Sequence, residues 1–184
     1  MKLSDFIYPN LNVARSVNLE RDGNKSEQID NYHITGKTIE IIKRFTSSLQ
    51  GEKVSAWALT GPYGMGKSAF LNYLLALTGV SGQVRKMATK KLLDADPELH
   101  EEFLGELNRV VGEKGFFRVY VTAAYEPINN TLARGLENVL QESDLRNKKR
   151  ILTRLKKLQK QKIIESHDLL SAFTEVQNIT QTPL

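Results

Sequence analysis

The feature that most constrains this chain is a glycine-rich run at residues 61–68, Gly-Pro-Tyr-Gly-Met-Gly-Lys-Ser. It satisfies the pattern G-x-x-x-x-G-K-[ST] in full, with Gly61, Gly66, Lys67 and Ser68 at the fixed positions. A loop of this kind turns backbone N–H groups toward phosphate oxygens, and glycine reaches the necessary conformations without Cβ strain. The pattern therefore predicts a loop that binds a nucleoside triphosphate.

The residue types suggest a role for several positions of the loop. Lys67 would reach the β- and γ-phosphates as a point charge, and the Ser68 hydroxyl would coordinate Mg²⁺. The N–H groups of Ser68 and Ala69 would face the α- and β-phosphates at the positive end of the following helix. We predict that ATP and Mg²⁺ bind here and that the nucleotide contacts Gly61, Pro62, Tyr63, Gly64, Met65, Gly66, Lys67, Ser68 and Ala69. The alternative is a glycine-rich turn whose lysine is incidental.

The hydrophobic pattern predicts two strands among several helices. Residues 54–60 form a short uncharged run that is typical of a strand buried on both faces, with Trp57 in the core. Residues 116–123 are rich in aromatic and β-branched side chains and predict a second strand. Apolar residues recur at helical spacing elsewhere, while residues 80–96 are ambiguous. Helices are expected over 37–50, 69–77, 97–111, 127–140, the basic stretch that follows, and 165–176.

Residues 58–79, ALTGPYGMGKSAFLNYLLALTG, resemble the P-loop NTPase superfamily. They look most like AAA+ and STAND ATPases, including large ATPases of bacterial phage-defence and restriction-like systems, and the resemblance covers roughly residues 32–140. It implies an α/β fold, the P-loop NTPase three-layer sandwich with a parallel sheet, here helix-rich and incomplete. It also implies an ATPase in which nucleotide binding and hydrolysis drive a conformational or oligomeric change, with further copies or other proteins as partners.

The same resemblance suggests where the base would lie. In those families the polypeptide just before the first helix lies against the adenine, and residues 32–37 occupy that stretch here. Tyr32, Ile34 or Thr35 would then contact the base. The other interpretation is an ordinary helix entry.

Hydrolysis in the resembled families needs an apolar strand that ends in Asp or Asp-Glu, and the sequence shows none. Glu126 is the nearest substitute, but a solvated loop residue is the better interpretation. Four aspartates lie in polar or helical settings and do not end an apolar strand: Asp94, Asp96, Asp144 and Asp168. The catalytic acid therefore stays unassigned. We expect the chain to be the N-terminal part of a larger ATPase, since the resembled fold has more strands than the two found.

Two other functions remain open. The loop also resembles that of nucleotide or small-molecule kinases, although sixty residues precede it and no acceptor-binding Asp-Arg pair or arginine-rich lid follows. A nucleotide-gated binding module that never hydrolyses is the other, because the acidic strand is missing. We expect residues 1–36 to be a lead-in segment and residues 37–184 to form the nucleotide-binding domain, with a basic helical segment at 144–176.

Charge is concentrated in one segment. Residues 146–162 contain nine Lys or Arg and no acidic residue, so the rest of the chain is negative although the net charge is +5. This segment could bind nucleic-acid phosphates. However, Ile151, Leu155 and Leu158 give the segment an apolar face that would pack inside the protein. The cations would then form only its solvated side, or a surface that binds an acidic protein. No aromatic residue interleaves with the charges, which argues against base stacking.

The rest of the composition excludes several classes of site. The chain has no cysteine, so disulfides, thiolate zinc sites and cysteine nucleophiles are excluded. Its histidines, His33, His100 and His167, lack the spacing of a metal site. The sequence contains neither a signal-peptide apolar region nor a run of about 18 apolar residues, so we expect a cytoplasmic protein without a membrane partner.

Overall fold

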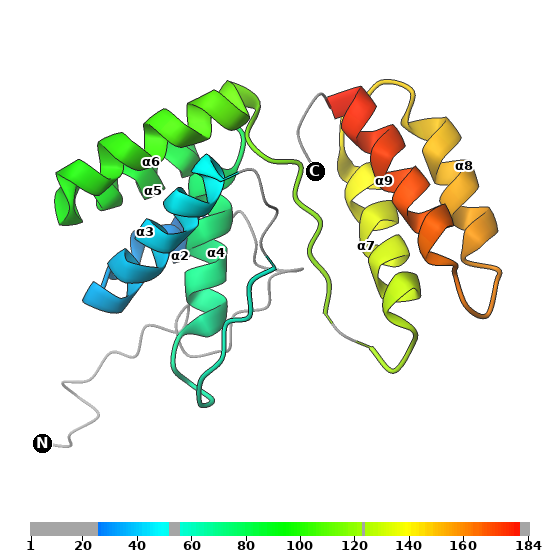
Figure 1. The fold of residues 1–184 in the computed structure, drawn as a ribbon, viewed down its shortest axis with the longest axis horizontal. Helices are drawn as coiled ribbons and strands as arrows, with labels where there is room; N and C mark the ends of the chain where they lie inside the picture. The colour runs from blue at the N-terminus through cyan, green and yellow to red at the C-terminus, as the bar shows by residue number, and fades with distance from the viewer. Residues whose placement is uncertain (1–25, 52–55, 123, 181–184) are drawn as a thin grey trace, which may run out of the picture. The chain divides into compact units, whose positions relative to one another are not determined.

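The computed structural model describes residues 26–51, 56–122 and 124–180 (Figure 1). The chain divides into two compact units: residues up to 77 together with 82–101, and residues 78–81 together with 102–184. The first unit carries α2, α3, α4, α5 and the start of α6, and the second carries the end of α6, a 3-10 turn η2, and α7, α8 and α9. Their bounds are α2 Ser26–Asp30, α3 Gly36–Gln50, α4 Lys67–Thr78, α5 Gln83–Ala95, α6 Pro97–Val110, η2 Gly112–Lys114, α7 Ile128–Glu142, α8 Lys148–Leu158 and α9 Ser166–Thr180.

The predicted three-layer α/β sandwich with a parallel sheet is wrong. Helices dominate the structure, and no residue in the described ranges belongs to a strand. The two segments predicted as strands are irregular at their described residues, 56–60 and 116–122. β-branched and aromatic residues favour a strand only where a neighbouring strand supplies ladder hydrogen bonds, and neither segment has such a neighbour among the described residues.

Trp57 shows the consequence for a single side chain. It is 49% exposed, so the prediction that it lies in the core is wrong. The rest of residues 56–60 are exposed as well, apart from a half-buried Leu59. Burial of a strand on both faces requires packed neighbours on both faces, and an uncharged run does not guarantee them.

The predicted helices are confirmed as α3, α4, α6, α7, α8 and α9, and the ambiguous stretch forms α5. Local capping explains two of the starts. The Thr35 hydroxyl accepts a hydrogen bond from the Thr38 N–H at 3.3 Å and caps α3, and Asp96 Oδ1 accepts from the Leu99 N–H at 3.0 Å and caps α6. Pro97 occupies the first position of α6, where a missing N–H costs nothing. Within the expected lead-in segment, residues 26–30 form α2, and residues 1–25 lie outside the described ranges.

The first unit holds α4 in place through its middle turns. Tyr73 is fully buried, and its hydroxyl donates to the Ala88 carbonyl of α5 at 2.8 Å. The Asn72 amide donates to Gln28 Oε1 of α2, also at 2.8 Å. The helix that follows the glycine-rich loop is therefore tied to α2 and α5.

The second unit contains an up-down-up bundle of α7, α8 and α9 (Figure 1). Asn130 fixes the α8–α9 turn, because its side chain accepts from the Ile164 N–H at 3.0 Å and donates to the Lys162 carbonyl at 3.3 Å. The fully buried core side chains are Ala133, Leu136, Leu140, Ile151, Leu155, Ile164 and Ala172. No helix in the described ranges is both long enough and apolar enough to cross a lipid bilayer.

Candidate phosphate-binding site

The glycine-rich loop runs from Gly61 directly into α4, which begins at Lys67. Three of its glycines have positive φ: 154° at Gly61, 83° at Gly64 and 77° at Gly66. A Cβ added at Gly64 or Gly66 would meet no atom within 4 Å, so there is room for a side chain at both positions. Glycine is needed there because of the positive φ of the backbone. These are the glycine-dependent conformations that the motif predicts for a loop whose N–H groups turn inward.

The first turn of α4 presents free donors. The N–H groups of Lys67, Ser68 and Ala69 have no hydrogen-bond acceptor among the described residues, as expected for the start of a helix. The next N–H, that of Phe70, donates to the Gly66 carbonyl at 2.8 Å. Together with the positive end of the helix dipole, these donors suit a phosphate group. The Ser68 hydroxyl lies in the same turn, where a metal ion bridged to phosphate would be held.

Lys67 closes the loop on itself. Its ammonium group donates to the carbonyl oxygens of Gly61 and Pro62, at 2.7 Å each. These two bonds hold the positive charge beside the loop. The sequence did not predict this contact, although a lysine five or six residues after the loop's first carbonyls is within reach of them.

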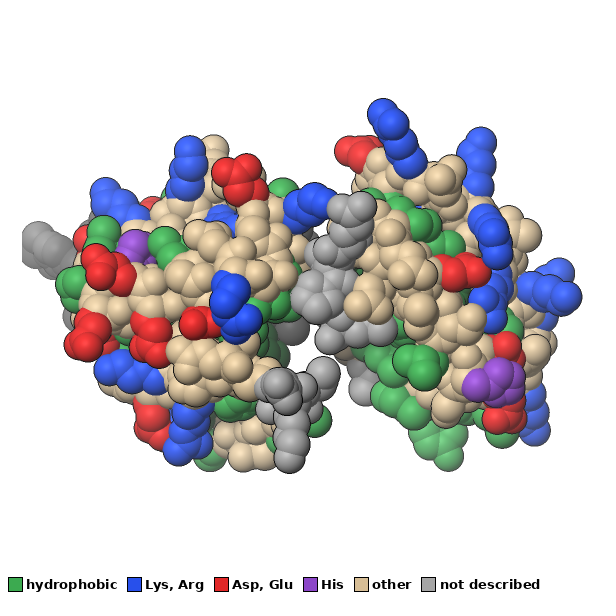
Figure 2. All heavy atoms as spheres, turned by 45° about the horizontal axis from the view of Figure 1, so that its top comes forward, with side chains coloured by type: hydrophobic (Ala, Val, Ile, Leu, Met, Phe, Trp, Pro, Cys, Tyr) green, Lys and Arg blue, Asp and Glu red, His purple; other side chains and the backbone are tan. Residues whose placement is uncertain are grey.

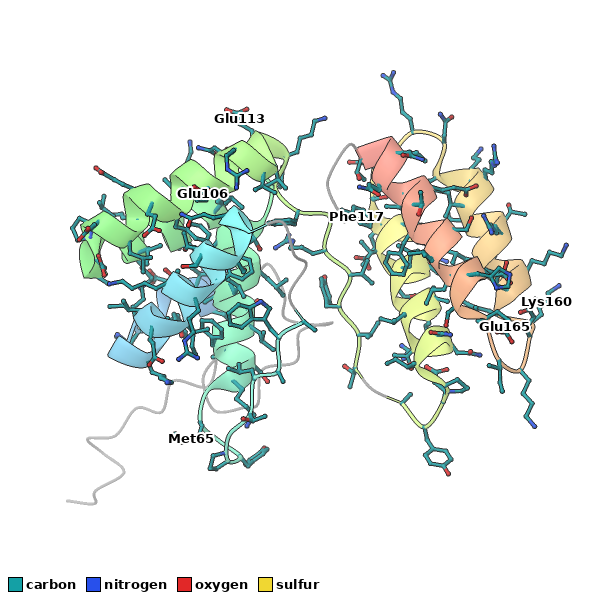
Figure 3. The ribbon with its side chains drawn as sticks, viewed as in Figure 1. Met65, Glu106, Glu113, Phe117, Lys160 and Glu165 are labelled. Carbon is teal, nitrogen blue, oxygen red and sulfur yellow. The ribbon has the colours of Figure 1, made fainter. Side chains whose placement is uncertain are left out.

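The tip of the loop faces solvent. Tyr63 is 93% exposed and Met65 is 71% exposed, and Figure 3 shows Met65 at the outer end of the loop. The exposed Pro62 and Gly64 complete this tip. Contacts from the tip to a phosphate would thus come from backbone groups. The side chains of Tyr63 and Met65 extend into solvent.

Tyr32 and Thr35, predicted to contact a base, are engaged in holding the entry to α3. The Tyr32 ring stacks on Tyr73 with centroids 4.6 Å apart, and its hydroxyl lies 3.0 Å from the Thr38 hydroxyl. Burial raises the pKa of Tyr32, and the hydrogen bond to Thr38 opposes that shift. Thr35 is the N-cap of α3 and lies 3.1 Å from the Thr38 hydroxyl. Their polar side-chain atoms are therefore used within the protein.

A shallow pocket of about 250 Å³ nevertheless borders this entry. Tyr32, His33 and Ile34 form one side of it, and Lys91, Asp94 and Ala95 of α5 form the other. Thr35 does not line the pocket. Of the residues expected at the base, the structure thus brings Tyr32 and Ile34 to one pocket and leaves Thr35 as a cap.

Glu126 has structural partners in the second unit. Its Oε1 accepts from the Thr131 hydroxyl at 2.9 Å and from two nitrogens of Arg134, at 3.1 and 3.2 Å. All three residues lie at or just before the first turns of α7. This network gives Glu126 a structural role at the start of that helix.

Across the ranges that the structure describes, no group of three or more His, Asp or Glu side chains is placed to hold a metal ion. A Mg²⁺ ion at the loop would have the Ser68 hydroxyl as a protein ligand beside phosphate oxygens and waters, whereas Mg²⁺ bound with a nucleotide usually also has one or two carboxylate ligands. The residues of the loop thus supply one part of that arrangement.

No protein family matches this sequence, and no curated protein or solved structure matches it either. The assignment of a function therefore depends on the loop's own geometry and chemistry.

Proposed function

We propose that residues 61–69 bind ATP with Mg²⁺ and that the chain is the nucleotide-binding module of an ATPase similar to the AAA+ and STAND proteins. One observation carries the proposal: glycines of positive φ lead directly into a helix whose first-turn N–H groups are free and whose first residue is Lys67. Each part of that arrangement suits a polyphosphate. A cytoplasmic location, where ATP and Mg²⁺ are available, and partner proteins or further copies of the chain belong to the same proposal.

Lys67 would change its contacts when a nucleotide binds. In the structure its ammonium group is bound to two loop carbonyls. The β- and γ-phosphates carry full negative charges and are stronger acceptors than carbonyls, so they would draw Lys67 away from Gly61 and Pro62. Nucleotide binding would thereby exchange contacts within the loop for contacts across the phosphates, which gives the loop two states.

A nucleotide-gated module without turnover is the second candidate. The observation that favours it is the position of Glu126, whose carboxylate is already bound by Thr131 and Arg134. A carboxylate oxygen that already accepts hydrogen bonds from these two side chains is less available to a water molecule. Binding and hydrolysis are therefore measured separately.

The test of the proposed function is calorimetric titration with Mg·ATP, together with phosphate release on the same sample. The substitution Lys67→Ala should lower the affinity for Mg·ATP about tenfold or more, because it removes a charge-assisted contact worth roughly 1.5–3 kcal/mol. It should leave the helical content unchanged by circular dichroism. Lys86→Ala, an exposed lysine of α5, is the matched control and should bind as the parent does.

The two measurements have distinct outcomes. Binding without phosphate release would favour the nucleotide-gated module, and binding with release would favour the ATPase. If Lys67→Ala bound Mg·ATP as tightly as the parent, or if the parent did not bind it at all, the proposed function would be wrong.

A further inference from the structure

Most basic residues of segment 146–162 lie on α8, and Arg146, Lys160 and Lys162 flank it. This helix buries Ile151, Leu155 and Leu158 in the core of the second unit, so its opposite side faces solvent. Lys149 and Lys156 lie two turns apart on that side, and Arg150 and Lys157 repeat the same spacing. Figure 2 shows Lys and Arg side chains gathered over this part of the second unit, and Figure 3 shows Lys160 in the turn between α8 and α9.

Some of these cations have partners within the protein. Arg150 and Arg154 lie 3.4 and 3.5 Å from Glu175, Arg154 also lies 3.8 Å from Asp168, and Lys148 donates to two carbonyls at the end of α7. The other cations of the segment are exposed and make no ion pair with any described residue. They are Arg146, Lys149, Lys156, Lys157, Lys160 and Lys162, and we name this set the α8 basic face.

We propose that the α8 basic face binds the phosphodiester backbone of nucleic acid, independently of base sequence. The composition of the exposed side of α8 distinguishes this partner from an acidic protein. A protein interface needs an apolar centre that excludes water, and the exposed residues of α8 itself are only Lys, Arg and Thr153. A pocket with apolar lining from Leu145, Ile151 and Ile179 borders Lys149 and Arg150, but Lys156, Lys157, Lys160 and Lys162 do not line it. Phosphate contacts need only positive charge and hydrogen-bond donors, which these side chains supply.

The dimensions of the surface also suit phosphates. Lys149 and Lys156 are separated by about 10 Å along the helix axis at a rise of 1.5 Å per residue. Duplex DNA presents one charge per about 1.7 Å of its axis, so roughly six phosphates fall within that length. Since the segment contains no aromatic residue to stack on bases, the contact would be with the backbone alone.

Salt dependence is the measurement that tests the proposal, made on the full chain by fluorescence anisotropy of a labelled short duplex DNA. Release of counterions from six phosphate contacts would weaken binding about 1,000-fold between about 50 and 200 mM salt. The double substitution Lys149→Gln with Lys156→Gln should reduce the slope of log K against log salt by about 2, one for each lysine. The control, Lys86→Gln with Lys90→Gln on the exposed side of α5, should keep the parent's slope.

Three further binding measurements identify the kind of partner. Two duplexes of unrelated sequence should bind within about threefold of each other, since backbone contacts carry no sequence information. A single strand of equal length shows which form of the backbone is preferred, and tight binding of either form supports the proposal. A polyglutamate chain should bind more weakly than the duplex.

Other results would overturn the proposal. They are an unchanged salt slope in the α8 variant, an equal loss in the α5 control, or the absence of duplex and single-strand binding at about 50 mM salt. Polyglutamate binding that is tighter than nucleic-acid binding would instead identify an acidic protein as the partner, with the exposed Ile163 just beyond the segment as an apolar contact. Circular dichroism of each variant confirms that α8 remains folded.

Discussion

At the scale of single residues, glycine serves two different purposes in this chain. Gly66 has a φ of 77° and open space around it, whereas Gly135 lies within α7, and a Cβ there would come 2.0 Å from Val121 Cγ1. Gly66 is required by the backbone, and Gly135 by the close approach of residues 116–122 to α7. The two alanine substitutions should therefore fail in different ways.

Gly66→Ala should lower the affinity for Mg·ATP by about tenfold, because holding alanine in the left-handed region costs roughly 1–2 kcal/mol, paid whenever the loop adopts its binding conformation. Gly135→Ala should instead lower the free energy of unfolding by about 1–3 kcal/mol through overpacking. Calorimetric titration measures the first effect, and urea denaturation measures the second. A Gly66→Ala protein with the parent's affinity would contradict the assignment of this loop as a phosphate site.

The residues of the loop could be predicted from sequence, but their contacts could not. Gly61, Gly64 and Gly66 follow from the motif, since each corresponds to a backbone conformation that only glycine reaches easily. The stacking of Tyr32 on Tyr73 joins residues that are far apart in the sequence, so no local pattern reveals it. For that reason the sequence suggested Tyr32 as a contact to the base, while the structure gives its ring and its hydroxyl partners within the protein.

At the scale of elements, helices were predicted well and strands were not. A helix is specified locally, by apolar spacing and by caps such as Thr35 for α3 and Asp96 for α6. A strand is completed by hydrogen bonds to another segment, and its own side chains do not supply that segment. Residues 116–122 illustrate this, because Phe117 and Val119 pack against the core of the second unit without belonging to a sheet.

The cap of α6 makes an acid-sensitive element. The Leu99 N–H, and after it the Lys43 ammonium group at 3.2 Å, lower the pKa of Asp96 in the folded protein. A carboxylate with a lowered folded pKa stabilises the protein above its unfolded pKa of about 3.9, and that stability is lost as the pH falls through the folded value. Stability should therefore decrease as the pH falls from about 5 through the folded pKa of Asp96.

Asp96→Asn should reduce that decrease, because asparagine can still cap the helix but does not titrate. Lys43→Gln should shift the acid transition toward higher pH, since it removes the hydrogen bond and the positive charge of Lys43, both of which lower the pKa of Asp96. Urea denaturation followed by circular dichroism across this pH range is the measurement. An Asp96→Asn protein with the parent's full pH dependence would mean that other carboxylates account for it.

At the scale of the whole molecule, the two units have separate cores, and only the first contains the glycine-rich loop. Tyr73, Leu77 and Leu92 are fully buried in the first unit, and Leu136 and Ile151 belong to the core of the second. A ligand stabilises the parts of a protein that must be folded for it to bind, and regions that open independently gain nothing. Nucleotide binding should thus stabilise the first unit against local opening more than the second.

Hydrogen exchange with and without Mg·ATP measures this difference. At a concentration about 100 times Kd, the ligand adds roughly 2.7 kcal/mol, so amides of α4 and of the helices tied to it should exchange up to about 100-fold more slowly. Amides of α7, α8 and α9 should keep their rates, and Lys67→Ala at the same ligand concentration should reduce the protection in α4 about tenfold or more. Equal protection in all these helices would mean that the two units open as one body, so the energy of nucleotide binding would then also reach the α8 basic face.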